Sequence, residues 1–335
     1  MPTSLPVPVP YIPAFLYNGI SMNVLKVGSR GSALALRQTG MVIEEITRLN
    51  PGVECRVEII KTTGDRILDV PLANIGDKGL FVKEIEAALL SGEIDLAVHS
   101  AKDLPTEMDE RLAIAAFPER VCPADALVSK AGGLKDLPAG AKVGTSSLRR
   151  RAQLLAARPD LQVMDLRGNL DTRLRKLDGD DYDAIMLACA GLTRMGLESR
   201  ITEVLPYDVC LPAVGQGALA IQCRAGDAAC EIAAALDSYW TRVCVIAERA
   251  LLERLEGGCQ VPIAALARED GGQIRLEAAV AALDGGSVVR KSAVGNASAP
   301  RELGLRLAGE LLDSPARELL EAARAAVGPK DIGAA

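Results

Sequence analysis

The chain has 335 residues, of which 49% are hydrophobic, 24% are charged and only 3% are aromatic, and its net charge at neutral pH is −6. This length suits two or three domains, each with a core of its own. The acidic total and the scarcity of aromatic side chains argue against a surface that attracts nucleic acid or stacks its bases.

Residues 1–21, MPTSLPVPVPYIPAFLYNGIS, are rich in proline and contain neither lysine nor arginine. A secretory signal begins with basic residues and a transit peptide contains arginines, so this segment matches neither. No apolar run elsewhere reaches the length of a membrane span. We therefore expect either a disordered leader outside the fold or a misplaced start ahead of Met22, with no membrane partner and a cytoplasmic protein.

The eight cysteines are spread singly along the chain without a CxxC pair, and His99 is the only histidine. Disulfide frameworks are typical of short secreted chains, and zinc sites need clustered cysteine and histidine. The sequence therefore predicts no disulfide framework and no metal site. Most of the cysteines are expected to be small buried hydrophobic residues.

From residue 24 onwards, short apolar runs alternate with amphipathic segments. Strands are predicted over residues 24–27, 53–61 and 94–98, and helices over 32–48, with Ser32 as N-cap, and 81–90. The pattern then begins again, with strands over 142–144, 163–166 and 184–187 and helices over 147–157 and 169–177. The apolar runs are too continuous for half-exposed sheets, so we predict two α/β lobes with covered sheets and a ligand site between them.

The composition changes again near residue 238. A helix through 248–255, strands near 274–283 and 288–294 and a helix over 301–312 follow. These elements predict a smaller α+β domain at the C-terminal end of the chain.

Basic side chains recur where predicted strands end and predicted helices begin. The group consists of Arg30, Lys102, Arg149, Arg150, Arg167, Arg173 and Arg194. In open α/β sheets the carboxyl ends of the strands line the binding crevice, and helix N-termini add N–H groups and a partial positive charge. Any one of these side chains could equally be a helix cap or a surface ion pair. Together they indicate a site for a ligand with several carboxylates or phosphates.

Lys102 and Asp103 stand side by side where the strand ending at Val98 gives way to His99-Ser100-Ala101. A carboxylate beside a cation can stabilise developing positive charge or move protons. From the six residues Val98–Asp103 alone, an ordinary surface turn is the better interpretation, and His99 is better interpreted as a structural histidine than as a base.

Cys259 follows two glycines in Leu255-Glu256-Gly257-Gly258-Cys259, where the backbone can approach a ligand closely. A nucleophilic thiol there would need a lowered pKa, which nearby arginines can provide. Taken alone, the segment is better interpreted as a turn with a buried cysteine.

The segment Gly215–Ala220 matches the dinucleotide-binding pattern G-x-G-x-x-A, and Asp237 follows at a fitting distance. Pro212 interrupts the strand that should precede the glycines, and Leu219–Cys223 looks extended rather than helical. We therefore reject a dinucleotide site.

Taken together and in order, these segments resemble the porphobilinogen deaminases over nearly the whole chain from Met22. The matching stretches are GSRGSALAL (28–36), GDKGLFVKEIE (76–86), AVHSAKDLP (97–105), VGTSSLRRRAQL (143–154), LRGNLDTRL (166–174), AGLTRMGL (190–197), LPAVGQGALAIQCR (211–224) and LEGGCQVPI (255–263). Each stretch alone is modest, but their order and spacing are highly specific.

The resemblance implies two lobes like those of periplasmic binding proteins, with mixed sheets, and a smaller α+β C-terminal domain. The implied domains are residues 22–118 with 216–237, residues 119–215, and residues 238–335. The implied activity is that of a monomeric transferase of haem and other tetrapyrrole biosynthesis. It condenses four porphobilinogen units, with loss of ammonia, onto a dipyrromethane cofactor joined by a thioether to Cys259, and hydrolysis then releases hydroxymethylbilane.

By the same resemblance, Asp103 is the main catalytic carboxylate, with Lys102 beside it. Loss of ammonia produces an azafulvene whose positive charge extends onto the pyrrole nitrogen, where an ionised carboxylate stabilises it. The cofactor is expected to be held by Cys259, Lys102, Asp103, Ser146, Ser147, Arg149, Arg150 and Arg173. The substrate and growing chain are expected to be held by Arg30, Ser32, Arg167, Arg173 and Arg194. Lys78 and Phe81 are expected to belong to a mobile loop near the active site.

Two alternatives use the same basic residues. A two-lobed protein that captures an anionic molecule without chemistry would share the architecture. Such a protein is usually exported, and it needs neither Cys259 nor Asp103. A nucleic-acid-binding protein would also use the arginines, but the acidic total and the few aromatic residues weigh against it.

Overall fold

The structure is a computed structural model, and it describes residues 24–66, 82–256 and 261–327. Its described strands are β1 (Val24–Ser29), β2 (Glu54–Ile59), β3 (Leu96–Ser100), β4 (Leu112–Ala116), β5 (Asp125–Ser129), β6 (Lys142–Gly144), β7 (Gln162–Met164), β8 (Ala184–Ala188), β9 (Glu203–Val204), β10 (Leu219–Arg224), β11 (Ile263–Asp270), β12 (Gln273–Ala281) and β13 (Val288–Asn296). Its described α-helices are α1 (Ala33–Leu49), α2 (Thr63–Arg66), α3 (Lys83–Ser91), α4 (Leu148–Ala157), α5 (Leu170–Asp178), α6 (Cys189–Arg194), α7 (Ala228–Ala234), α8 (Tyr239–Arg254), α9 (Pro300–Leu312) and α10 (Ala316–Val327).

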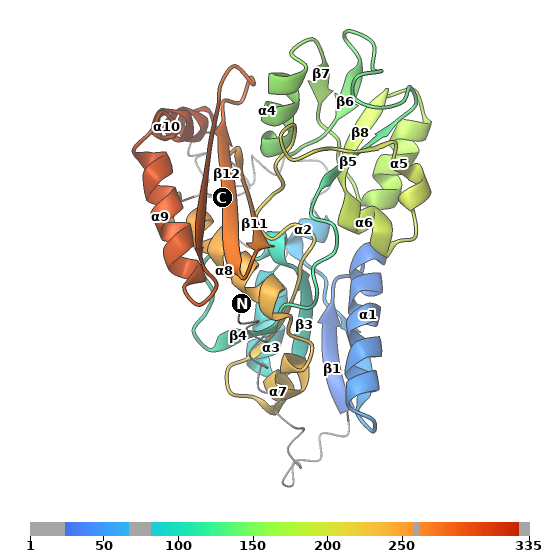
Figure 1. The fold of residues 1–335 in the computed structure, drawn as a ribbon. Helices are drawn as coiled ribbons and strands as arrows, with labels where there is room; N and C mark the ends of the chain where they lie inside the picture. Colours follow the sequence, from blue (N-terminus) through green and yellow to red (C-terminus); the bar gives the residue numbers. More distant parts are fainter. Residues whose placement is uncertain (1–23, 67–81, 257–260, 328–335) are drawn as a thin grey trace, which may run out of the picture.

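Two five-stranded sheets form the two lobes, seen at the lower centre and the upper right of Figure 1. Their strand orders are β2-β1-β3-β10-β4 and β7-β6-β8-β5-β9. In each sheet three parallel strands come first, and the fourth strand pairs antiparallel with both of its neighbours. The chain leaves the first sheet after β4, builds the second sheet and returns through β10. The predicted α/β fold with two mixed-sheet lobes is therefore confirmed.

The helices that follow parallel strands begin at the carboxyl ends of those strands. Ser32 caps α1 by accepting a hydrogen bond from Ala35 N, as predicted, and Ser147 caps α4 by accepting one from Arg150 N. Each capping side chain replaces one of the backbone partners that the first turn of a helix lacks. The N-termini of α1 and α4 therefore lie at the strand ends where a ligand site was expected.

The third sheet, β11-β12-β13, is antiparallel and packs with α8, α9 and α10, at the left of Figure 1. Leu251, Leu276 and Leu307 are fully buried between these layers. Gly304 lets α9 approach α8 closely, because a Cβ atom there would lie 2.3 Å from the carbonyl oxygen of Ala247. The predicted α+β domain at the C-terminal end is confirmed.

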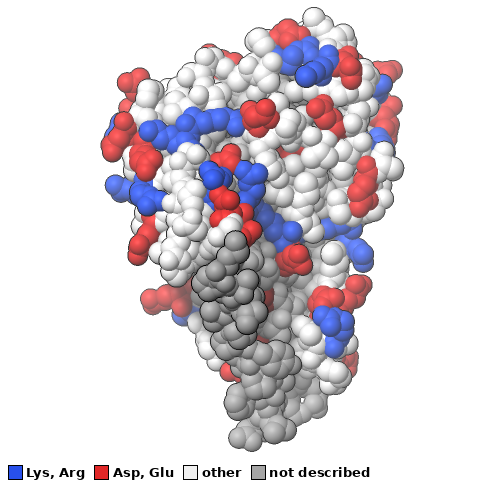
Figure 2. All heavy atoms as spheres, in the orientation of Figure 1, with Lys and Arg blue, Asp and Glu red and all other residues white. Residues whose placement is uncertain are grey.

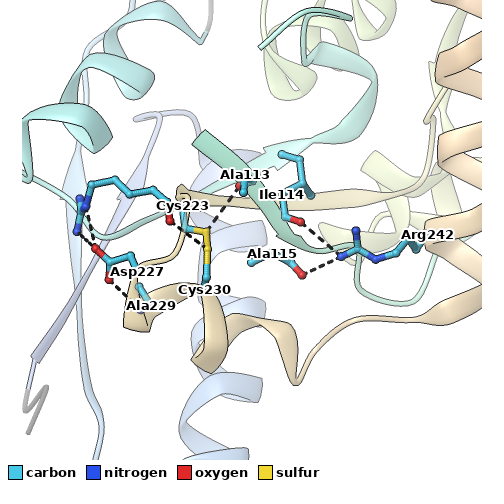
Figure 3. Close-up of a disulfide and its surroundings, with 9 residues drawn as sticks. Ala113, Ile114, Ala115, Cys223, Asp227, Ala229, Cys230 and Arg242 are labelled. Carbon is cyan, nitrogen blue, oxygen red and sulfur yellow. Dashed lines mark hydrogen bonds and ion pairs between the residues drawn. A yellow bond between two sulfur atoms is a disulfide. The ribbon is translucent and has the colours of Figure 1, made fainter. Parts of the chain in front are cut away.

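The structure contains one disulfide that the cysteine spacing did not predict. Cys223, at the end of β10, is bonded to Cys230 in α7 (Figure 3). The chain turns back after Arg224, and Asp227 caps α7 by accepting a hydrogen bond from Ala229 N. This turn brings the two Cα atoms to 5.8 Å, within the range that a disulfide requires. The link joins two neighbouring elements of the first lobe and forms no wider framework.

No helix within residues 24–66, 82–256 and 261–327 is both long enough and apolar enough to cross a membrane.

Candidate active site

The loop that carries Lys102 and Asp103 is fixed at the end of β3. After Ser100 the chain forms a single 3-10 turn over Ala101–Asp103, and Ala101 is buried and donates its N–H to the carbonyl oxygen of Ala218 at 3.0 Å. Gly215 packs against this turn, because a Cβ atom there would lie 3.1 Å from Lys102 N. The turn is therefore held by its own strand and by the segment that returns from the second lobe. It leaves Asp103 exposed and Lys102 partly buried.

Lys102 lies within electrostatic range of both lobes. Burial lowers the pKa of Lys102 from 10.5 to about 8, Asp103 opposes this shift, and the nearby guanidinium groups of Arg150 and Arg149 add to it. The basic helix of the second lobe therefore lies near the turn of the first. At neutral pH, Lys102 is a cation that can lose its proton at modest cost.

His99, next to this turn, is a structural residue. It is buried, its Nε2 lies 3.0 Å from Oε1 of Gln222 on the neighbouring β10, and burial lowers its pKa to about 4. It is therefore neutral at physiological pH. The interpretation of His99 as structural is confirmed.

Arg149 and Arg150 lie in the first turn of α4 and are both buried against one carboxylate, that of Asp125. Arg149 donates from Nη1 to Asp125 Oδ2 at 2.6 Å and from Nη2 to Oδ1 at 3.2 Å. Arg150 donates from Nε to Oδ1 at 2.9 Å. The two arginines hold the pKa of Asp125 far below its usual range despite its full burial. The arginine pair therefore carries a net charge of +1 with its carboxylate.

Three further arginines of the second lobe have donors or charge that the described residues do not fully satisfy. Nη2 of Arg167 and Nε of Arg194 are buried without a hydrogen-bond partner among the described atoms. Burial lowers the pKa of Arg173 and of Arg194 to about 10, and for Arg173 the positive charges of Arg150 and Arg167 add to the shift. A buried cation without a matching anion is costly, so these groups favour an anionic ligand.

The other predicted residues of the first lobe, Arg30 and Ser32, lie between β1 and α1. Arg30 lines a small pocket together with Gln38, Ser100 and Asp103. The hydroxyl of Ser32 is engaged as the cap of α1. Arg30 therefore shares a pocket with the predicted catalytic carboxylate.

The predicted serines of the second lobe lie at the start of α4. Ser146 donates its hydroxyl to the carbonyl oxygen of Leu166 at 2.7 Å, and the hydroxyl of Ser147 is the cap of α4. Both hydroxyls are thus engaged within the second lobe, beside the arginine pair.

Cys259, Lys78 and Phe81 lie outside the described residues, as do residues 1–21. No group of three or more histidine, cysteine, aspartate or glutamate side chains within the described ranges could hold a metal ion.

The sequence reasoning missed Asp125 and Gln216. Gln216 donates from Nε2 to Asp125 Oδ1 at 2.9 Å, and Arg194 donates to the carbonyl oxygen of the next residue, Gly217, at 2.7 Å. One signal was available for Asp125, because a single acid opens the apolar run Ala126-Leu127-Val128. Gln216 lies in the segment whose glycines first suggested a dinucleotide site.

The charge of this region suits a ligand with several carboxylates. The residues named for the site include seven basic side chains but only two described carboxylates, Asp103 and Asp125. Arg149, Arg167 and Arg194 each keep one buried N–H without a partner among the described atoms. Elsewhere, Lys and Arg are interspersed with Asp and Glu over the face shown in Figure 2. The residues present therefore fit the acetate and propionate groups of a dipyrromethane.

Comparison with known proteins identifies the same family along the chain. The family models described as "Porphobilinogen deaminase, dipyromethane cofactor binding domain" and "Porphobilinogen deaminase, C-terminal domain" match residues 25–232 and 242–313. The chain is 52% identical to the porphobilinogen deaminase of Pelotomaculum thermopropionicum over 302 residues, which are 90% of this chain and 97% of the relative. It is 56% identical to that of Desulforudis audaxviator over 301 residues, 89% and 97% of the two chains. Among solved structures, the periplasmic aliphatic sulphonate binding protein SsuA from Escherichia coli matches with a TM-score of 0.38 and 15% identity, over 70% of this chain and 71% of that one. The chain belongs to the porphobilinogen deaminase family.

Proposed function

We propose that the junction of the two lobes is the active site of a hydroxymethylbilane synthase, with Asp103 as its catalytic carboxylate. The reaction condenses four porphobilinogen units stepwise, with loss of ammonia, onto a covalent dipyrromethane, and then releases hydroxymethylbilane by hydrolysis. The observation that carries the proposal is the position of Asp103. Its exposed carboxylate stands on a fixed turn beside Lys102, within electrostatic range of Arg173 from the other lobe.

The chemistry requires a carboxylate at this point. When ammonia leaves the aminomethyl group of porphobilinogen, positive charge develops and extends onto the pyrrole nitrogen. An ionised Asp103 near that N–H stabilises the charge. Lys102, whose pKa is about 8, can give a proton to the leaving amine and regain one near neutral pH.

Cys259 is proposed to hold the dipyrromethane through a thioether, and the bound group supplies the pyrrole carbon to which the next unit is joined. We assign its carboxylates to Lys102, Ser146, Ser147, Arg149, Arg150 and Arg173, with Asp103 near its pyrrole N–H groups. We assign the carboxylates of the substrate and growing chain to Arg30, Ser32, Arg167, Arg173 and Arg194. The unpartnered N–H groups of Arg167 and Arg194 support this assignment.

We further propose the domain division predicted from the sequence: residues 22–118 with 216–237, residues 119–215, and residues 238–335. We also propose that the protein works as a cytoplasmic monomer.

The intact mass of the purified chain tests the proposal. A covalent dipyrromethane adds on the order of a few hundred daltons, and Cys259→Ser removes that increment because the thiol is the nucleophile. Cys122→Ser is the matched control, because Cys122 is an exposed free thiol and this substitution leaves the increment in place. An increment that survives Cys259→Ser, or a wild-type chain that never acquires one when supplied with porphobilinogen, would contradict the proposal.

A further inference from the structure

We infer that Asp125 is a positioning residue of the active site, which holds Arg149 and Arg150 at the angle from which the cofactor carboxylates are bound. The inference rests on the proposed function and deepens it. It concerns a residue that contacts neither substrate nor cofactor and acts through the two arginines.

Asp125 is enclosed by donors. It is the first residue of β5 and has no exposed surface, and its carboxylate accepts from both guanidinium groups. In addition to the three bonds already given, Nη2 of Arg150 lies 2.7 Å from Oδ1. Two contacts to each arginine fix the plane of each guanidinium group, because a planar fork on a carboxylate allows little rotation.

The same carboxylate ties α4 to the chain segment that returns to the first lobe. Gln216 donates from Nε2 to Asp125 Oδ1 at 2.9 Å and to the carbonyl oxygen of Pro123 at 2.7 Å. The neighbouring Gly215 packs against Lys102, so the contacts run without a gap from the arginine pair to the catalytic turn. The position of the arginines is thus set relative to Lys102 and Asp103.

A second carboxylate of the first lobe is paired with an arginine but lies outside this network. Asp95, which directly precedes β3, accepts from Arg224 Nη2 at 3.0 Å and from Lys26 N at 2.9 Å. Its side chain is 14% exposed, so loss of its charge leaves a partly buried arginine with one ion pair fewer. It lies at the end of β3 opposite to the turn that carries Lys102 and Asp103. Asp95 is therefore the control for a loss of stability without a change at the site.

Loss of the Asp125 charge has a specific consequence for the site. Without it, the adjacent guanidinium groups of Arg149 and Arg150 repel each other in a buried setting and lose their common acceptor. They are then expected to turn toward water or toward backbone carbonyls such as those of Leu211 and Met186, which they already contact. Binding of carboxylates weakens, whereas the chemistry at Asp103 is unchanged once the ligand is in place.

The test compares Asp125→Asn with Asp95→Asn in the full chain, with three measurements: melting temperature, the fraction of chains that acquire the covalent mass increment when supplied with porphobilinogen, and kcat per loaded chain. We expect both variants to melt at lowered temperatures. Only Asp125→Asn should lower the mass-shifted fraction, by about tenfold or more at a fixed time of loading, while kcat per loaded chain stays within about threefold. An unchanged mass-shifted fraction in Asp125→Asn, or an equal loss in Asp95→Asn, overturns the inference.

A milder variant keeps the inference testable if Asp125→Asn does not fold. Gln216→Met removes one donor to Asp125 and leaves both ion pairs in place. We expect it to lower the mass-shifted fraction at a fixed time of loading by about threefold, in the same direction. A Gln216→Met chain that acquires the mass increment like the wild type overturns the inference. Failure of the proposed function would look different, because the wild-type chain itself would then lack the mass increment and the turnover.

Discussion

Replacement of Arg194 by leucine separates two effects of this buried guanidinium group: its effect on the free energy of unfolding and its contribution to ligand binding. The side chain of Arg194 is only 7% exposed, Nη2 donates to the carbonyl oxygen of Gly217 and Nε has no partner among the described atoms. Burial lowers the pKa of Arg194 from 12.5 to about 10, which corresponds to about 3 kcal/mol against the charged form. The hydrogen bond to Gly217 returns about 1 kcal/mol. Without ligand, Arg194→Leu should therefore be as stable as the parent chain or about 1–2 kcal/mol more stable.

For the binding of porphobilinogen, the same substitution is expected to be unfavourable. A charge-assisted bond from Arg194 to a carboxylate contributes about 1.5–3 kcal/mol, so its loss should raise KM for porphobilinogen by about 10- to 150-fold. The melting temperature is measured in a Cys259→Ser background, which removes the covalent cofactor, and KM in the wild-type background. Arg275→Leu is the control, because Arg275 is exposed and paired with Asp270, and its KM should stay within about twofold. A strongly lowered melting temperature together with an unchanged KM would show that Arg194 is structural, which refutes the reasoning.

Three further predictions concern other residues. Since the pKa of Lys102 is about 8, its charge is present below that pH and lost above it, so kcat/KM should fall as the pH rises through 8. Lys102→Arg keeps the charge and should remove this alkaline limb, and a limb that persists would point to another group. The Asp103→Asn variant should fold with a normal melting temperature, and its kcat should be lower by about 100-fold or more. Asp109→Asn, which changes a partly exposed carboxylate six residues away, should leave kcat unchanged. Similar rates in the two variants would show that Asp103 is not the catalytic carboxylate. The disulfide should contribute about 2–3 kcal/mol, so the double variant Cys223→Ser, Cys230→Ser should melt lower with kcat/KM within about twofold. Equal thiol alkylation before and after reduction would show that the bond is absent.

The elements that the sequence predicted well are those with local signals. Ser32 and Ser147 were placed at helix starts by residue type, and both are caps in the structure. The helix predicted through Glu248 instead begins at Tyr239, with Ser238 as its cap. Tyr239 and Trp240 are poor helix formers, so propensity hid a start that the cap and the packing against α9 fix. The short strand β4 and the long strand β11 were missed because their alanine-rich runs do not distinguish strand from helix.

The residues of the candidate site also fall into those with a local sequence signal and those without one. Positions of basic residues at strand ends could be read from the sequence, because the topology of an α/β sheet brings those ends together. Their partners could not, since Asp125 lies 24 residues from Arg149 and 91 from Gln216 along the chain. Such long-range contacts decide which guanidinium group is paired with a carboxylate. The disulfide between Cys223 and Cys230 was not predicted for a related reason, because the turn into α7 that brings the two residues together leaves no CxxC spacing.

The division between neutralised and unopposed arginines bears on turnover as well as on binding. Four unopposed charge-assisted bonds at about 1.5–3 kcal/mol each would reach the free energy of nanomolar binding at the upper end of that range. A site with every basic residue unopposed would therefore release a product with many carboxylates slowly. Asp125 offsets one charge of the Arg149 and Arg150 pair, whereas Arg167 and Arg194 have no ion pair with a described carboxylate. Nε of Arg149, Nη2 of Arg167 and Nε of Arg194 are each buried without a partner among the described atoms. We therefore expect the site to combine a partly neutralised pair with separate cations that each successive unit can engage and leave.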